Sequence, residues 1–151
     1  MKKIILLAST ALITFTATAQ VKIYSGDPNI DIKYKRTIVS GNTVIIDFLM
    51  TNLLRTEIEA CLYNFVNLSF TDDEGNMYGN QNFKINVGNS GKETGVFSPG
   101  IPLKVRLTLT NIDEYATAIT SIIYPYYYYP SPSINSVDRT MKIYNIPIPR
   151  N

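Results

Sequence analysis

The stretch of sequence that decides the fold is Leu103–Thr110, which reads LKVRLTLT. Its apolar residues occupy every second position, and Lys, Arg and Thr fill the positions between them. Successive residues of a β-strand point to opposite faces of a sheet, whereas a helix needs apolar residues every three or four positions. This stretch therefore predicts a strand with one buried and one solvated face.

The same period of two recurs along the chain from about residue 30. Segments with this pattern are 30–35, 43–51, 66–71, 82–87 and 141–144. Turn-forming residues lie between them, in the segments 25–28, 40–42, 72–76, 88–91 and 98–100. Short, half-buried strands separated by such turns are typical of antiparallel sandwiches and barrels. We therefore expect an all-β fold built from two antiparallel sheets.

Residues 54–65 allow two interpretations. The segment is preceded by no helix cap other than Thr51-Asn52, and it runs directly into a strand pattern, which favours a loop followed by a strand. The alternative is a helix, because its apolar residues share one helical face: Leu54, Ile58, Cys61, Leu62 and Phe65.

Residues 1–19 have the composition of a secretory signal peptide. Two lysines follow Met1, residues 4–15 are mainly apolar, and Ala17-Thr18-Ala19 has the small-x-small pattern of a cleavage site. The apolar run is shorter than the roughly 20 residues that span a bilayer, so an uncleaved anchor is the weaker alternative. We expect a single domain, residues 20–151, without a membrane span after cleavage. Its location would be the periplasm or the cell surface of a Gram-negative bacterium.

The charged and metal-binding residues exclude several classes of function. The chain carries 14 Lys and Arg against 12 Asp and Glu, and removing Lys2 and Lys3 with the signal leaves 12 of each sign. No basic run exceeds Lys33-x-Lys35-Arg36, so nucleic acid is not an expected partner. The chain has no histidine and only Cys61, which rules out a Ser-His-Asp triad and the usual zinc sites. We expect a buried Cys61, with an intermolecular disulfide as the weaker alternative, and no cofactor, no metal and no enzymatic activity.

The acidic segment Asp72–Asn76 has two interpretations. It holds three carboxylates, which suggests calcium, but it lacks the ligand spacing of an EF-hand loop. We therefore predict a polar hairpin turn between Phe70 and Tyr78.

The tyrosine-rich segment 124–132, YPYYYYPSP, is the strongest candidate for a binding site. Consecutive residues of an extended chain point both ways, so at least two of these tyrosines reach solvent if the other side is core. Exposed tyrosines offer an apolar ring and a hydroxyl to proteins and sugars, although the rings could instead cover the end of the sandwich or protect a sheet edge. Pro125 lacks an N–H and predicts an edge position or a bulge. The candidate binding residues are Tyr126, Tyr127, Tyr128 and Tyr129.

Three segments together resemble a known type of domain. Residues 41–52 read as a strand ending in Thr-Asn, residues 72–78 as an acidic hairpin closed by Tyr, and residues 99–107 as the entry to the late alternating strand. In this order they resemble small exported bacterial domains of the immunoglobulin-like, telokin-like kind, over roughly residues 31–123. The resemblance implies a two-sheet sandwich without a catalytic site.

These observations favour an exported, non-catalytic binding domain, monomeric or weakly oligomeric, that contacts a protein or glycan through its loops and residues 124–129. One alternative is a protease inhibitor that inserts an extended loop, either Gly88–Phe97 or Tyr124–Asn135. A second is a dedicated glycan-binding module. The least favoured is a hydrolase that uses two of the carboxylates Asp47, Glu57, Glu59, Asp113 and Glu114.

Overall fold

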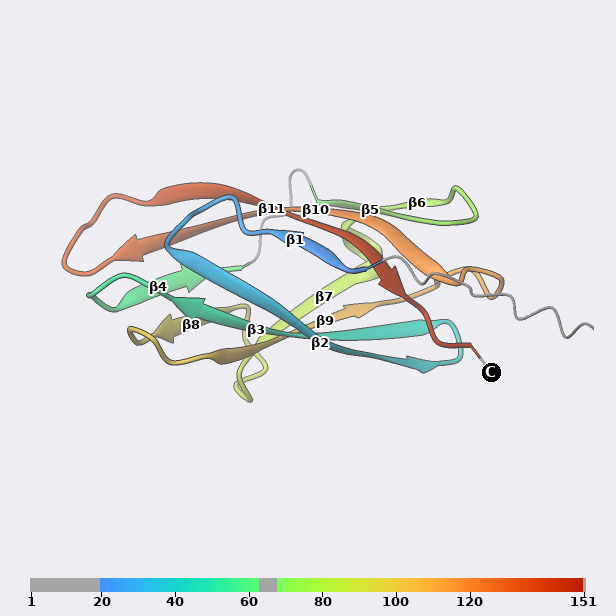
Figure 1. The fold of residues 1–151 in the computed structure, drawn as a ribbon, viewed down its shortest axis with the longest axis horizontal. Coiled ribbons are helices and arrows are strands. Elements are labelled where there is room, and N and C mark those ends of the chain that lie inside the picture. The colour runs from blue at the N-terminus through green and yellow to red at the C-terminus, as the bar shows by residue number, and fades with distance from the viewer. Residues whose placement is uncertain (1–19, 63–67, 151) are drawn as a thin grey trace, which may run out of the picture.

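The computed structural model describes residues 20–62 and 68–150, which form two antiparallel β-sheets packed face to face (Figure 1). The predicted signal peptide lies outside these residues. No helix within them is long and apolar enough to cross a membrane. The strands are β1 (Lys22–Tyr24), β2 (Ile30–Ser40), β3 (Thr43–Asn52), β4 (Ile58–Cys61), β5 (Ser69–Asp72), β6 (Met77–Tyr78), β7 (Phe83–Val87), β8 (Thr94–Phe97), β9 (Leu103–Leu109), β10 (Ala118–Pro130) and β11 (Val137–Pro147), with a 3₁₀ turn at Asn80–Asn82.

The order of the strands is that of an immunoglobulin-like sandwich. Sheet A has the order β1-β11-β10-β4-β8, with β5 pairing another part of β10 and β6 pairing β5. Sheet B has the order β2-β3-β9-β7. A constant-type immunoglobulin domain has strands A-B-E-D in one sheet and C-F-G in the other. If β2 is taken as strand A, the sheet B order β2-β3-β9-β7 corresponds to A-B-E-D. In sheet A, the neighbouring strands β4, β10 and β11 correspond to C, F and G. The predicted all-β sandwich is confirmed.

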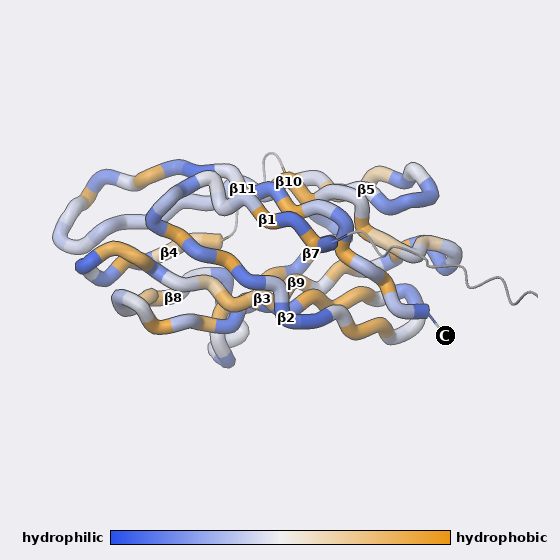
Figure 2. The backbone as a smooth tube through the Cα atoms, viewed as in Figure 1, coloured by the Kyte–Doolittle hydropathy of each residue, from blue (hydrophilic) through white to orange (hydrophobic). Residues whose placement is uncertain are grey.

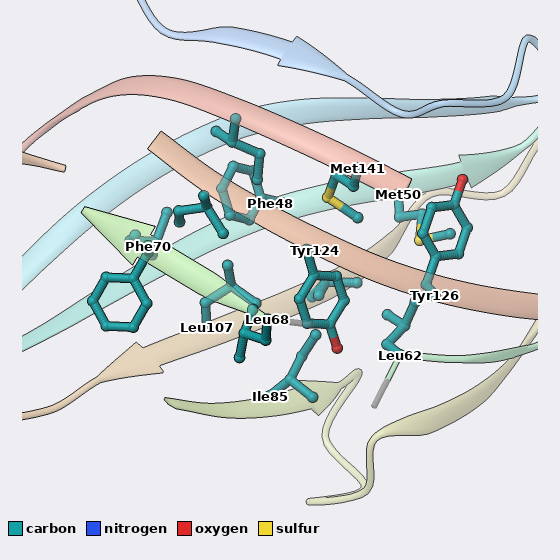
Figure 3. Close-up of a cluster of buried hydrophobic side chains, with 14 of the residues drawn as sticks. Phe48, Met50, Leu62, Leu68, Phe70, Ile85, Leu107, Tyr124, Tyr126 and Met141 are labelled. Atoms are coloured by element: carbon teal, nitrogen blue, oxygen red, sulfur yellow. The ribbon is translucent and has the colours of Figure 1, made fainter. Parts of the chain in front are cut away.

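The core lies between the sheets and follows the alternation of the sequence. In β9, Val105, Leu107 and Leu109 are buried, while Lys104 and Arg106 on the other face are only partly covered. The neighbouring β3 contributes its own alternate residues to the same interior, and Figure 2 shows apolar and polar residues alternating along the strands. Aromatic, aliphatic and methionine side chains from both sheets meet there (Figure 3).

The ambiguous segment is a loop followed by a strand. Residues 53–57 are irregular, and β4 follows at Ile58–Cys61. Cys61 is buried and free, as expected for a lone cysteine. The end of the helical pattern, residues 63–65, lies outside the described residues.

β10 corrects the expectation for Pro125. This strand is central in sheet A, so Pro125 lies neither at an edge of the sheet nor at a bulge. Its position is tolerated because the pairing on one side of β10 changes there. Ile119–Ile123 pair with β5, and Tyr127–Pro130 pair with β4, so Pro125 falls in the interval between the two ladders.

The acidic segment forms the predicted hairpin between β5 and β6. Asp72 accepts hydrogen bonds from the backbone N–H groups of Glu74 and Asn76 and from the hydroxyl of Tyr78. Its carboxylate therefore closes the turn. Among the described residues, no group of three or more His, Cys, Asp or Glu side chains is arranged to hold a metal ion.

Candidate binding face

The tyrosine run is divided between the core and the surface. Tyr126 and Tyr128 point inward and are 1% and 3% exposed, and the inward-pointing Tyr124 is 2% exposed. Tyr127 and Tyr129 point outward, and Tyr129 is 38% exposed. The expectation that four consecutive tyrosines form a contact surface is therefore corrected for Tyr126 and Tyr128, whose rings lie inside the sandwich. Only Tyr127 and Tyr129 of the candidate residues are placed to meet a ligand.

The inward tyrosines hold the connector between β1 and β2 against sheet A. The Tyr126 hydroxyl donates to the backbone carbonyl of Ser25 at 2.8 Å, and the Tyr128 hydroxyl donates to Asp27 Oδ2 at 2.7 Å. The same carboxylate accepts from Arg139 Nε at 2.7 Å and from the backbone N–H of Asn29 at 2.8 Å. Two of these hydrogen bonds tie residues 25–29 to β10, one ties them to β11, and the fourth lies within the connector itself.

Asp27 is a buried carboxylate that stays ionised. Burial alone would raise its pKa, but the bonds from Asn29, Tyr128 and Arg139 outweigh burial and lower the pKa below its usual range. Burial and the bond to Asp27 raise the pKa of Tyr128 to about 12. The phenol therefore remains a donor and the carboxylate an acceptor throughout the neutral range.

The connector positions β1 beside β11 and so places Tyr24 on the outer face of sheet A. Tyr24 pairs across the ladder with Lys142 and is 57% exposed. Its ring meets that of Tyr144 edge-on, with centroids 6.1 Å apart. This separation and the edge-on arrangement are favourable for aromatic pairs.

An open groove of about 960 Å³ lies beside this tyrosine pair. Its lining combines three tyrosines, the buried Tyr126 among them, with a proline ring, a carboxylate, an ammonium group, the guanidinium of Arg139 and a threonine hydroxyl. The outward-facing groups among them are Tyr24, Pro125, Asp138, Thr140, Lys142 and Tyr144.

A second hollow, of about 300 Å³, lies at the other end of the outward row of β10. It is lined by Tyr129, Val96, Glu57, Glu59 and residues 131–133. Tyr127 lies between the two hollows along β10, and its ring meets Tyr129 edge-on at 5.7 Å. We call the surface formed by Tyr24, Tyr144, Pro125, Tyr127 and Tyr129 the tyrosine face.

Sequence reasoning missed Tyr24 and Tyr144, which are isolated tyrosines at opposite ends of the chain. They meet only because β1 pairs with β11, and no pattern in the sequence indicates that pairing.

The five carboxylates considered for hydrolysis are not gathered in one place. Asp47 lies on the outer face of sheet B between two arginines. Glu57 and Glu59 share the hollow beside Tyr129 and are both exposed. Asp113 and Glu114 lie in the connection between β9 and β10, where Asp113 accepts a hydrogen bond from Asn76.

Comparisons with known proteins identify no family. No family model matches the chain, and no curated protein matches it. Among solved structures, the GAE domain of GGA2p from Saccharomyces cerevisiae is similar, with 13% identity, a TM-score of 0.47, and coverage of 87% of this chain and 100% of that one. The ASH / PapD-like domain 7 of human CEP192 is also similar, with 12% identity, a TM-score of 0.46, and coverage of 98% and 100%. These likenesses concern the fold alone.

Proposed function

We propose that the chain is a non-catalytic binding domain whose tyrosine face holds a carbohydrate chain. The groove beside Tyr24 and Tyr144 is the observation that carries the proposal. Aromatic rings pack against the apolar faces of sugar rings, and the polar groups of Asp138, Thr140 and Lys142 can exchange hydrogen bonds with sugar hydroxyls. The rings belong to two paired strands, which keeps the groove in shape without a ligand.

The exposure of Glu57 and Glu59 supports binding rather than hydrolysis in the second hollow. A glycosidase needs one carboxyl group whose pKa is raised, and burial is the usual means. Both side chains lie in solvent. Their role in the proposal is to accept hydrogen bonds from a bound sugar.

The proposal includes export to the periplasm or cell surface of a Gram-negative bacterium, as the signal-like residues 1–19 suggest. Membership of the small bacterial telokin-like domains belongs to the same proposal, since it rests on the sequence resemblance. Amino-terminal sequencing of the protein from a cell envelope fraction tests export. Maturation at Gln20 is the expected result, and an intact Met1 in the cytoplasm would contradict it.

Isothermal titration calorimetry with a panel of soluble neutral polysaccharides tests the binding face. The double variant Tyr24→Ala, Tyr144→Ala is expected to lose at least about tenfold in affinity, because each ring contributes a large contact area. The matched control is Tyr115→Ala, which removes a tyrosine that is 72% exposed but lies in the connection between β9 and β10.

Equal affinity of the double variant and the wild type would remove the tyrosine face from the proposal. Binding of a protein ligand, with no response to any polysaccharide, would replace the carbohydrate by a protein partner.

The loop between β10 and β11 supports a second candidate function, protease inhibition. Residues 131–136 are all exposed, and Ile134 at 90% offers an apolar side chain to an enzyme cleft. The rest of the two predicted inhibitory segments is less suited, because Thr94–Phe97 and Tyr124–Pro130 are paired within sheet A. Slowed turnover at stoichiometric protein, abolished by Ile134→Asp, is the expected result. Unchanged progress curves across a protease panel would dispose of this candidate.

A further inference from the structure

The outer face of sheet B gathers positive charge from distant parts of the sequence. The register of the strands places Lys33, Arg36, Lys84, Lys104 and Arg106 on this face. We call these five residues the basic face. The carboxylates on the same face are Asp31, which lies 3.5 Å from the ammonium group of Lys33, and Asp47. Because residues 20–151 carry 12 charges of each sign, a local excess here leaves an acidic excess on the rest of the domain.

Asp47 fixes the two arginines of the basic face. It accepts hydrogen bonds from Arg36 Nε at 2.9 Å, Arg106 Nε at 2.7 Å and Arg106 Nη2 at 2.9 Å. The carboxylate is nearly inaccessible, while the Arg36 side chain is 61% exposed. One buried carboxylate thus holds two guanidinium groups at the surface. Holding them in advance reduces the entropy lost when they bind an anion.

A hollow of about 240 Å³ adjoins Lys104 and Arg106 on this face. Asn86 and the turn residues Gly88, Asn89 and Gly91 form its other walls. Pockets that enclose a whole small molecule have volumes of roughly 300–1,000 Å³. A smaller hollow beside an open row of cations fits one unit of a longer chain.

The side chains between the cations indicate the class of partner. Thr43, Thr51, Thr108 and Asn86 offer hydroxyl and amide groups, and β3 adds the half-buried Ile45 and Leu49, of which Leu49 lies between Lys33 and Lys104. Among the described residues of this face, Ile38 is the most exposed large apolar side chain, at 38%, and it pairs with the half-buried Ile45. Protein interfaces depend on aromatic and apolar anchors, and peripheral membrane helices insert an apolar surface. This face favours a hydrophilic, extended polyanion instead.

We infer that the outer face of sheet B binds a linear polysaccharide that carries carboxylate or sulfate groups. Arginine forms bidentate hydrogen bonds with such groups, and lysine adds charge around them. The cations belong to β2, β7 and β9, so a chain crossing the strands meets them in succession. This surface lies on the opposite sheet from the tyrosine face and does not depend on it.

The test is calorimetric titration with polygalacturonate and with dextran sulfate, each compared with neutral dextran. Binding of at least one polyanion that weakens steeply with added salt is expected, whereas any binding of dextran should not depend on salt or on the lysines of the basic face. The variant Lys33→Gln, Lys104→Gln should lose roughly 30-fold in affinity, because each lysine near an anionic surface is worth about fivefold. The matched control is Lys22→Gln, Arg55→Gln, which removes the same charge from β1 and from the loop after β3.

Equal losses in the two double variants would overturn the inference, because only net charge would then matter. Absence of binding to both polyanions at low salt would also overturn it. Tighter binding to phosphatidylglycerol vesicles or to duplex DNA would assign the face to another partner. The Tyr24→Ala, Tyr144→Ala variant should keep its polyanion affinity, so this inference and the proposed function can fail independently.

Discussion

The hydroxyl of Tyr128 donates a 2.7 Å hydrogen bond to the carboxylate of Asp27, 101 residues earlier in the chain. The bond joins the central strand of sheet A to the connector that carries β1. Tyr128 therefore has no contact role of its own at the surface. Its effect on the tyrosine face is indirect: it holds the connector between β1 and β2, and the connector determines where Tyr24 lies.

Replacing Tyr128 by Phe should destabilise the domain by about 2 kcal/mol, since hydrogen bonds to charged groups contribute about 1.5–3 kcal/mol. The variant keeps the ring and its packing but leaves the buried Asp27 with one donor fewer. The free energy of unfolding from urea titration measures the effect. A loss below about 0.5 kcal/mol would show that the bond contributes little.

The Tyr124→Phe variant is the matched comparison and should be neutral or stabilising by up to about 1 kcal/mol. Among the described residues, the Tyr124 hydroxyl is buried without a hydrogen-bond partner. Figure 3 shows it among apolar side chains that include Ile85. Burial raises the pKa of the Tyr124 phenol, so the hydroxyl stays neutral in the folded domain. A clear loss of stability in the same urea titration would indicate a partner for this hydroxyl.

Stability should fall in acid through Asp47. Hydrogen bonds from Arg106 and Arg36 outweigh burial and lower the pKa of Asp47 from 3.8 to about 2. The unfolded chain therefore takes up this proton first as the pH falls. The stabilisation is complete above about pH 5 and is lost from about pH 4 to about pH 2, by roughly 2 kcal/mol.

The Asp47→Asn variant isolates this contribution, since other carboxylates such as Asp27 change in the same direction. Its free energy of unfolding should fall less steeply than that of the wild type over the same range. Parallel pH profiles for the two proteins would contradict the assignment.

The sequence predicts those strands whose two faces differ in polarity. β9 is the clearest, because its inner positions are aliphatic and its outer positions are charged or hydroxylated. β10 has no such contrast. Tyrosines point to both of its faces, and a register shift between Ile119 and Ser121 interrupts its alternation.

The two candidate faces could not be predicted, because each depends on which strands are neighbours. Alternation indicates that Lys104 and Arg106 point away from the core, but only the pairing of β9 with β3 brings Asp47 to Arg106. Likewise, Tyr24 meets Tyr144 only through the pairing of β1 with β11. Such pairings depend on the packing of the whole sandwich, and a period of two does not encode them.

Gly26 is a glycine whose replacement should damage both the fold and the tyrosine face. Its φ of +77° disfavours any L side chain, and a Cβ atom there would collide with the backbone carbonyl of Thr140 in β11. Gly75 has a similar φ, +86°, but a Cβ atom there meets nothing within 4 Å. The Gly75→Ala variant therefore measures the backbone strain alone, about 1 kcal/mol. Gly26→Ala should cost about 1–3 kcal/mol more, because the connector must move away from β11.

The movement of the connector gives Gly26→Ala a second, independent readout. Since the connector positions β1, a displaced Tyr24 should weaken ligand binding in the Gly26→Ala variant even where the protein is fully folded. Gly75→Ala, in the hairpin between β5 and β6, should leave that affinity unchanged. Urea titration and calorimetry of the two variants separate the effects. Equal stability losses would mean that the close approach to Thr140 relaxes freely, and unchanged affinity would mean that the connector does not control the position of Tyr24.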